Sequence, residues 1–202
     1  MNGNPAEEGY NSTPSTMKTI LPLALLGLAA FASAQSNGVS VGPTVGGYFF
    51  TDRVVRDAFS YPVLSYGFSP VPTGRPAPNK VQPDFNIVSA SKNGNKLFLL
   101  PVTASYELQL IKKSPYGVYD REAAFVPFLR LLAGPAYYDY ALTDSNGVRR
   151  SGKQVGLTAG AVLGVSINKR LTLSGSYNFF SKVDQLDFSG FSLNLTYSLT
   201  RF

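Results

Sequence analysis

Apolar side chains alternate with small or polar ones along the C-terminal part of the chain. In residues 154–167 the odd positions carry valine, leucine, alanine and isoleucine, while the even positions carry glutamine, glycine, threonine and serine apart from Val162. The same alternation returns over 171–179 and 191–199. A period of two puts alternate side chains on opposite faces, so the pattern predicts three successive β-strands.

The connections between these strands are short and polar. Asn168-Lys169-Arg170 joins the first two strands, and residues 182–185 precede the third, which predicts tight antiparallel hairpins. Asp144-Ser145-Asn146-Gly147 is a further turn signal. With weaker alternation, the sequence predicts five more strands, at 39–50, 61–69, 85–91, 97–110 and 126–140. The total is eight.

Two segments interrupt the strand pattern. In residues 51–59, Asp52 and Arg56 have the i,i+4 spacing of a helical ion pair, Val55 and Phe59 share a side, and Thr51 or Asp52 is a candidate cap, which predicts a short helical turn. Residues 70–84 hold five prolines and are predicted to form an extended loop that excludes a central strand. Counting strands places this loop and residues 112–122 at the same end as the 168–170 turn, which we assign to the periplasmic side.

The composition of the two faces indicates the surroundings of the sheet. One face carries large apolar side chains, among them Val155, Leu157, Leu163, Leu173, Leu193 and Leu195. The other carries glycine, serine, threonine and asparagine with almost no charge, whereas a soluble barrel would turn charged residues outward. The pattern therefore predicts an all-β fold, a closed antiparallel transmembrane β-barrel whose apolar face contacts lipid, because an open sheet edge in hydrocarbon leaves backbone groups unpaired.

A helical alternative exists for the same segment. Gly156, Gly160 and Gly164 are four residues apart, as on a helix face that packs against another helix. The apolar window between Lys153 and Lys169 is short for a membrane-spanning helix, and the alternation recurs in neighbouring segments without the glycines. The strand interpretation is preferred.

The N-terminal region predicts export. Met17-Lys18 precedes an apolar run over 20–31 that ends in Ala32-Ser33-Ala34, the pattern of a signal peptide over 17–34. Cleavage is expected between Ala34 and Gln35, which leaves residues 35–202 as the barrel domain. Residues 1–16 form a polar leader upstream of Met17.

The signal peptide, the strands and the segments "AGPAYYDY", "GLTAGAVLGVSINKRLTLSGSYNF" and "LNLTYSLTRF" together resemble the small outer-membrane barrels of the OmpA-like and OmpX-like kind. The resemblance implies the outer membrane of a diderm bacterium, contact with its lipids, and insertion by the barrel-assembly machinery. It also implies that Phe202 is the C-terminal aromatic residue which that machinery reads. Phe202 departs from the register, since it shares parity with Ser198 and Thr200.

The chain offers little catalytic chemistry. Outer-membrane enzymes that resemble this size class, such as the palmitoyltransferase, phospholipase and omptin groups, rely on histidine, and this sequence has none. The sequence shows no Ser-x-x-Lys motif and no carboxylates at metal-ligand spacing, and cysteine is absent. We therefore expect no enzymatic activity, no cofactor and no metal.

The remaining candidates are a polar pair, an aromatic belt and the charge. Glu107 and Arg130 fall on the predicted interior of consecutive strands, either as a pair that fills the lumen or as a lining that selects a solute. Tyr137, Tyr138, Tyr140, Tyr177 and Phe179 are predicted to anchor the barrel at the membrane interface.

The net charge of +6 is explained most simply by positive charges spread over solvated loops, and as a contact signal it favours anionic headgroups or polysaccharide over nucleic acid. We expect a structural or envelope-interaction role, with loops that contact envelope polymers, surface layers or protein partners. A narrow porin-like conduit or binding barrel for a small solute is the alternative.

Overall fold

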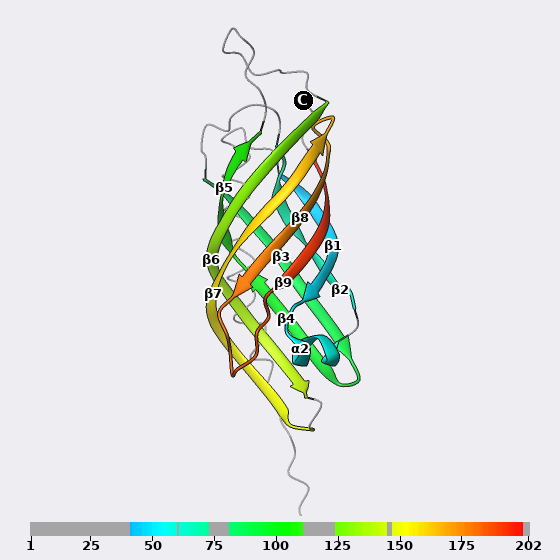
Figure 1. The fold of residues 1–202 in the computed structure, drawn as a ribbon, viewed down its shortest axis with the longest axis vertical. Coiled ribbons are helices and arrows are strands. Elements are labelled where there is room, and N and C mark those ends of the chain that lie inside the picture. Colours follow the sequence, from blue (N-terminus) through cyan, green and yellow to red (C-terminus); the bar gives the residue numbers. More distant parts are fainter. Residues whose placement is uncertain (1–40, 60, 73–80, 111–123, 145–146, 200–202) are drawn as a thin grey trace, which may run out of the picture.

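The computed structural model describes residues 41–59, 61–72, 81–110, 124–144 and 147–199. Within them, nine strand segments form one antiparallel sheet that closes on itself, because β1 (Val41–Phe50) pairs with both β2 (Val63–Pro70) and β9 (Gly190–Tyr197). Figure 1 shows these strands tilted around a common axis. The predicted closed all-β barrel is confirmed.

Two of the nine segments are halves of one strand. β4 (Asn95–Pro101) and β5 (Thr103–Gln109) are separated only by Val102, whose N–H donates a hydrogen bond of 2.9 Å to the Pro135 carbonyl. Both halves pair with β3 (Val81–Lys92) and with β6 (Phe125–Thr143) in an unbroken register. The ring therefore has eight strands, as predicted, and the halves correspond to the strand predicted over 97–110.

The other strands follow the predictions closely. β7 spans Arg149–Ile167, and β8 spans Leu171–Phe180. Gly156, Gly160 and Gly164 all lie in β7, so the helical alternative for this segment is wrong. Among the described residues, no helix has the length and apolarity needed to cross a bilayer.

Residues 81–84 correct one prediction. They belong to β3 although the prolines placed them in an extended loop: Pro83 pairs with Ala104 of β5. Pairing of β3 with β2 ends at Phe85, so Pro83 lies where only one side of the strand has a partner. A residue without an N–H is tolerated at such an edge. Pro70, the first residue of the predicted loop, is the last residue of β2, and residues 73–80 and all of 112–122 lie outside the described residues.

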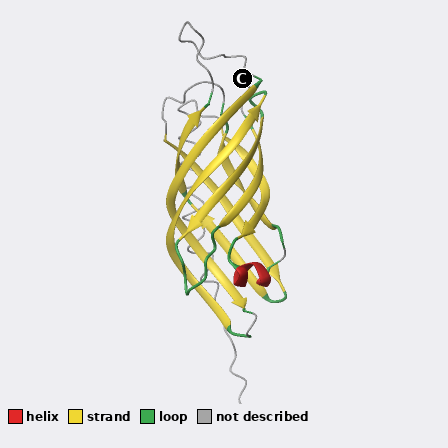
Figure 2. Cartoon of the chain, viewed as in Figure 1, coloured by secondary structure: helices red, strands yellow, loops and turns green. Residues whose placement is uncertain are grey.

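The predicted helical turn forms α2 (Arg53–Ala58). Asp52 caps it, accepting a hydrogen bond from the Val55 N–H at 3.0 Å, and Val55 and Phe59 are both buried. The ion pair along the helix joins Arg53 to Asp57 at 3.6 Å, not Asp52 to Arg56 as predicted, because the Asp52 carboxylate serves the cap. Figure 2 shows this helix in red at one end of the barrel.

Tight turns join the strands at both ends. The two-residue turn Asn93-Gly94 has positive φ at both positions, +49° and +80°, and Gly147 (φ +78°) donates its N–H to the Asp144 carbonyl. Both turns lie at the end that carries α2, here named the α2 end (Figure 1). Asn168 and Lys169, also at positive φ, form the predicted β7–β8 hairpin at the opposite end, here named the β7–β8 end.

Glycines of β7 make room for aromatic rings of β6. A Cβ on Gly152 would lie 2.8 Å from the Tyr140 hydroxyl, and one on Gly164 would lie 2.7 Å from the Phe128 ring. Gly156 leaves space for the Tyr138 ring in the same way. The inward glycines thus allow large rings to fill a barrel whose interior is only wide enough for side chains.

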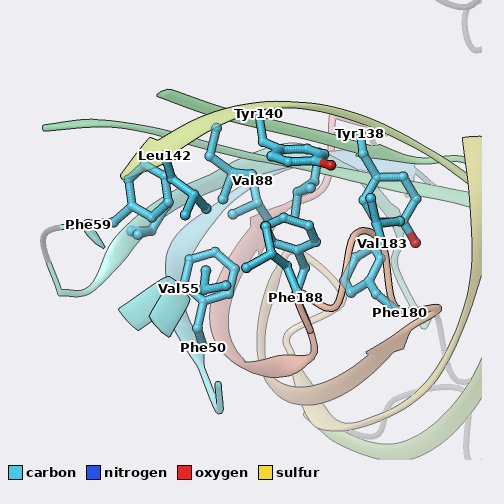
Figure 3. Packing of buried hydrophobic residues seen from close by; sticks show 14 of the residues in the cluster. Phe50, Val55, Phe59, Val88, Tyr138, Tyr140, Leu142, Phe180, Val183 and Phe188 are labelled. Atoms are coloured by element: carbon cyan, nitrogen blue, oxygen red, sulfur yellow. The ribbon is translucent and has the colours of Figure 1, made fainter. Parts of the chain in front are cut away.

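The interior changes character along the barrel. At the α2 end it holds a hydrophobic cluster, here named the end core (Figure 3). The end core consists of Tyr48, Phe50, Val55, Ala58, Phe59, Val63, Val88, Leu97, Leu99, Ala136, Tyr138, Tyr140, Leu142, Phe180, Val183, Leu186 and Phe188. Beyond it, toward the β7–β8 end, the interior is lined by hydroxyl and amide side chains with a few charges.

The outer surface changes in the opposite sense. On β7, Val155, Leu157 and Leu163 are exposed apolar side chains, whereas Arg149, Ser151 and Lys153 occupy the same face nearer the α2 end. The outer face of β7 is therefore apolar over one stretch and polar over the next, where the interior beside the strand is filled by the end core, whose members come from other parts of the chain. The second arrangement is that of a protein in water.

Candidate functional site

The outer wall carries a band of exposed apolar side chains. The six residues predicted to face lipid, Val155, Leu157, Leu163, Leu173, Leu193 and Leu195, are between 44% and 70% exposed. They point away from the lumen, since their strand neighbours Ser174, Ser192 and Asn194 are buried inside. An apolar surface of this size, wrapped around a closed sheet, is what a bilayer stabilises.

A row of aromatic rings borders the band toward the α2 end. Tyr61 packs edge-on against Phe49 at 4.9 Å, and Phe191 packs against Tyr177 at 4.8 Å. Phe49 and Phe191 are register partners, so the four rings follow one another across β1, β9 and β8. Phe179 is exposed two residues farther along β8.

A second group of rings borders the band toward the β7–β8 end. Phe68 and Phe85 are register partners whose ring centroids lie 5.6 Å apart. Tyr106, Phe125 and Tyr197 are exposed close to the ends of their strands. Amphipathic and aromatic rings at two levels around a barrel are typical of the two headgroup regions of a bilayer.

The tyrosines of β6 depart from the predicted belt. Tyr138 and Tyr140 lie in the end core, fully buried, so their assignment to the belt is wrong. They occupy even positions, which face inward on this strand. Tyr137 is at an odd position, which faces outward on this strand, but its side chain is only 8% exposed. Its register partner Leu100 is also buried, so Tyr137 does not belong to the exposed rings.

Inside the barrel, the predicted pair is part of a larger charged cluster. The Arg130 Nη2 donates to Glu107 at 2.6 Å and to the Pro70 carbonyl at 2.7 Å. Its Nη1 donates to Asp84 at 3.1 Å, and Ser69 donates to the other oxygen of that carboxylate. All three charged side chains are at most 8% exposed. The Arg130 guanidinium also lies 5.0 Å from the centre of the Phe128 ring.

Hydroxyl and amide side chains of β1, β8 and β9 line the remaining lumen. Thr44 and Thr196 share a hydrogen bond of 2.6 Å, as do Ser176 and Ser192, and Asn194 donates to Ser192 at 2.7 Å. The two hydroxyl pairs tie β9 to β1 and to β8 from the inside, and the bond from Asn194 stays within β9. A cavity of about 40 Å³ lies between these side chains and the charged cluster. It has room for a few water molecules, since roughly 10–15 Å³ of such space holds one.

The end core closes the lumen at the α2 end. Phe188 comes from the loop before β9, and its ring packs against those of Tyr138 and Tyr140 at 5.8 and 5.5 Å. Tyr140 also donates a hydrogen bond to Asp184, and Arg150 donates to the Asp184 carbonyl at 2.8 Å, so the loop is fastened to β6 and β7. Side chains thus block the passage at the α2 end.

The chemistry of the interior is that of packing and charge pairing. The described residues contain no group of three or more histidine, cysteine, aspartate or glutamate side chains arranged to hold a metal ion. The hydroxyls lining the lumen have no imidazole to activate them, because the sequence lacks histidine. The predicted cleavage position, Ala34 and Gln35, and the predicted assembly signal, Phe202, lie outside the described residues.

Two parts of this arrangement were missed from the sequence. Asp84 lies next to Pro83, and the prolines placed both outside a strand, so no signal put this carboxylate in the lumen. The end core was missed because Leu97, Leu99 and Val88 occupy the polar-face parity of their strands. Leucines at both parities over 97–100 are the signal that both faces are covered there.

No protein-family model and no curated protein matches the sequence. Among solved structures, the chain is similar to the N-terminal β-barrel domain of Pseudomonas aeruginosa OprF, at 14% identity over 79% of this chain and 97% of that one, with a TM-score of 0.47. It is similar to Neisserial surface protein A (14%; 80% and 97%; TM-score 0.45) and to Ail, the attachment invasion locus protein of Yersinia pestis (13%; 80% and 96%; TM-score 0.44). The strand pairing described above defines the barrel independently of these likenesses.

Proposed function

We propose that the chain is an integral outer-membrane barrel that is non-enzymatic and has a structural or envelope-interaction role. The main support for this proposal is the exposed apolar band, which is bordered by two levels of aromatic rings on a closed sheet. Burying such a band in water-free hydrocarbon is favourable, and the pairing of β1 with β9 joins the first strand to the last, so that no free sheet edge is left along that seam. In this proposal the signal peptide is cleaved, the barrel-assembly machinery inserts the chain, and the β7–β8 end faces the periplasm.

The α2 end is the part that would meet partners outside the membrane. Its outer face is polar and its end core is buried, as in a soluble protein. Exposed cations there include Arg56 and Arg149. Their charge supports contact with anionic envelope polymers or with acidic surfaces of protein partners.

A lysine in the apolar band tests the membrane placement. We expect Leu163→Lys to lower the free energy of unfolding in lipid vesicles by about 2–4 kcal/mol, the cost of a lysine near the middle of a bilayer. Leu163 is suited to this because it is 62% exposed and has no role in the interior. Urea titration of the vesicle-embedded protein, with the folded fraction read from gel mobility before boiling, gives the measurement.

Ser151→Lys is the matched control. Ser151 lies on the same outward face of β7, also exposed, but nearer the α2 end beside the charged residues. It is expected to change the free energy of unfolding by less than about 0.5 kcal/mol, as exposed surface substitutions usually do. Equal tolerance of the two lysines would mean that the band faces water.

The lumen argues against the alternative function of a conduit. The end core blocks it, and the cavity beyond holds only a few water molecules. We therefore expect the purified protein to leave planar bilayers sealed, without discrete conductance steps. Reproducible steps that persist after the protein is purified in its folded form would favour the narrow conduit instead.

A further inference from the structure

Three strands bring a group of charged side chains together on the outer wall near the α2 end. Asp139 of β6 and Lys153 of β7 are register partners, with 3.5 Å between the lysine Nζ and a carboxylate oxygen. On the other side of β6, Asp139 pairs with Phe98, two residues from Lys96 on β4. The two lysines thus flank a single aspartate.

The orientation of these side chains follows from their neighbours. Leu97 and Leu99 belong to the end core, which turns Lys96 and Phe98 outward. Tyr138 and Tyr140 belong to it as well, which turns Asp139 outward together with its partner Lys153. Both lysines are exposed, and half of the Lys153 side chain remains accessible despite the ion pair.

This charged group directly adjoins the apolar band. Val155 and Leu157 follow Lys153 on the same face of β7 and are 69% and 70% exposed, while Phe98 follows Lys96 on β4. When the band is in a bilayer, Lys153 lies two residues beyond Val155, an exposed apolar side chain of the band, and Lys96 lies two residues beyond Phe98, which is partly exposed. That is the level of the lipid headgroups.

We propose that Lys96 and Lys153 form a binding site for the phosphate of an anionic lipid headgroup, whose acyl chains lie along Val155 and Leu157. The inference rests on the proposed membrane placement. Two ammonium groups outweigh the one carboxylate between them, so the site has a net positive charge that complements a phosphate diester. Arg149, exposed four residues beyond Lys153 on the same face, adds to that charge.

The competing explanation is that Lys153 serves only to pair with Asp139. An exposed ion pair of this kind contributes little to stability. The two explanations differ in what Asp139→Asn does. If the pair is only structural, this substitution leaves lipid preference unchanged, whereas at a phosphate site it removes the competing carboxylate and strengthens binding.

The test uses the full chain folded in nanodiscs of phosphatidylcholine with phosphatidylglycerol as the anionic probe. Native mass spectrometry gives the ratio of bound phosphatidylglycerol to phosphatidylcholine. We expect the variant Lys96→Gln with Lys153→Gln to lose about fivefold of that preference per lysine, the usual worth of a basic residue at an anionic surface. Asp139→Asn is expected to raise the preference. A separate arm adds inorganic phosphate, which lacks acyl chains and is expected not to displace the lipid.

The control variant is Arg53→Gln with Lys92→Gln, which removes the same charge from exposed positions on α2 and at the β3–β4 turn. It is expected to keep the wild-type preference. An equal loss in this control, an unchanged preference in the lysine variant, or full displacement by phosphate would overturn the site. Failure of the wild-type protein to enter nanodiscs at all would instead overturn the proposed membrane placement.

Discussion

Replacing Arg130 with methionine is expected to lower the free energy of unfolding by about 3–5 kcal/mol, the usual cost of removing one partner from a buried charge cluster. The guanidinium holds two buried carboxylates, Asp84 and Glu107, and also bonds the Pro70 carbonyl. Methionine has a similar length but supplies neither charge nor donors. Urea titration of the vesicle-embedded barrel measures the loss.

Neutralising the carboxylates in the same variant separates charge from packing. Arg130→Met combined with Asp84→Asn and Glu107→Gln is expected to recover more than half of the loss, because no buried charge is then left without its counter-ion. A loss below about 1 kcal/mol in the single variant would show that the cluster is hydrated and contributes little. A triple variant no more stable than the single one would attribute the effect to packing.

Phe188→Ala is expected to cost about 3–5 kcal/mol, the range for truncating a large buried aromatic side chain. The ring is fully buried in the end core and contacts Phe50, Tyr138 and Tyr140. Its loss also loosens the loop before β9. Limited trypsin digestion provides a local readout, since Lys182 lies in that loop and cleavage there should become faster.

Phe125→Ala is the matched control for this ring. Phe125 is the first residue of β6 and is 64% exposed, so its truncation creates no interior cavity. It is expected to cost under about 1 kcal/mol, with trypsin cleavage after Lys182 unchanged. Similar losses from both substitutions would mean that the end core is loosely packed.

The strands were predictable from the sequence because a period of two puts alternate side chains on opposite faces, and the closed barrel was predictable from the composition of those faces. The hairpin at 168–170 is confirmed, whereas the connection between β8 and β9 is longer than predicted and spans residues 181–189. The glycine and hydroxyl face of β7, β8 and β9 identified the inside correctly. The alternation alone predicted that Glu107 and Arg130 face the interior from consecutive strands, and in the structure the Arg130 Nη2 lies 2.6 Å from a Glu107 carboxylate oxygen.

The features that could not be predicted are those that depend on which strands are neighbours and on where the apolar band ends. Asp84 joins Arg130 through a barrel interior that no local pattern describes. Tyr138 and Tyr140 were mistaken for interface rings because an aromatic residue at a strand end fits either side of the wall. The change of the outer face of β7 from apolar to charged toward the α2 end distinguishes the two, and its meaning is visible once Leu97 and Phe188 are known to pack in the end core with these rings.

The end core draws on almost the whole circumference: Phe50 comes from β1, Val88 from β3, Tyr138 from β6 and Phe180 from β8. Because its members are dispersed in this way, the cluster cannot assemble on a partial sheet, and it consolidates only after the first and last strands have met. Folding intermediates with an open sheet would expose these apolar rings, and a chaperone that binds apolar side chains would recognise them before closure but not after it.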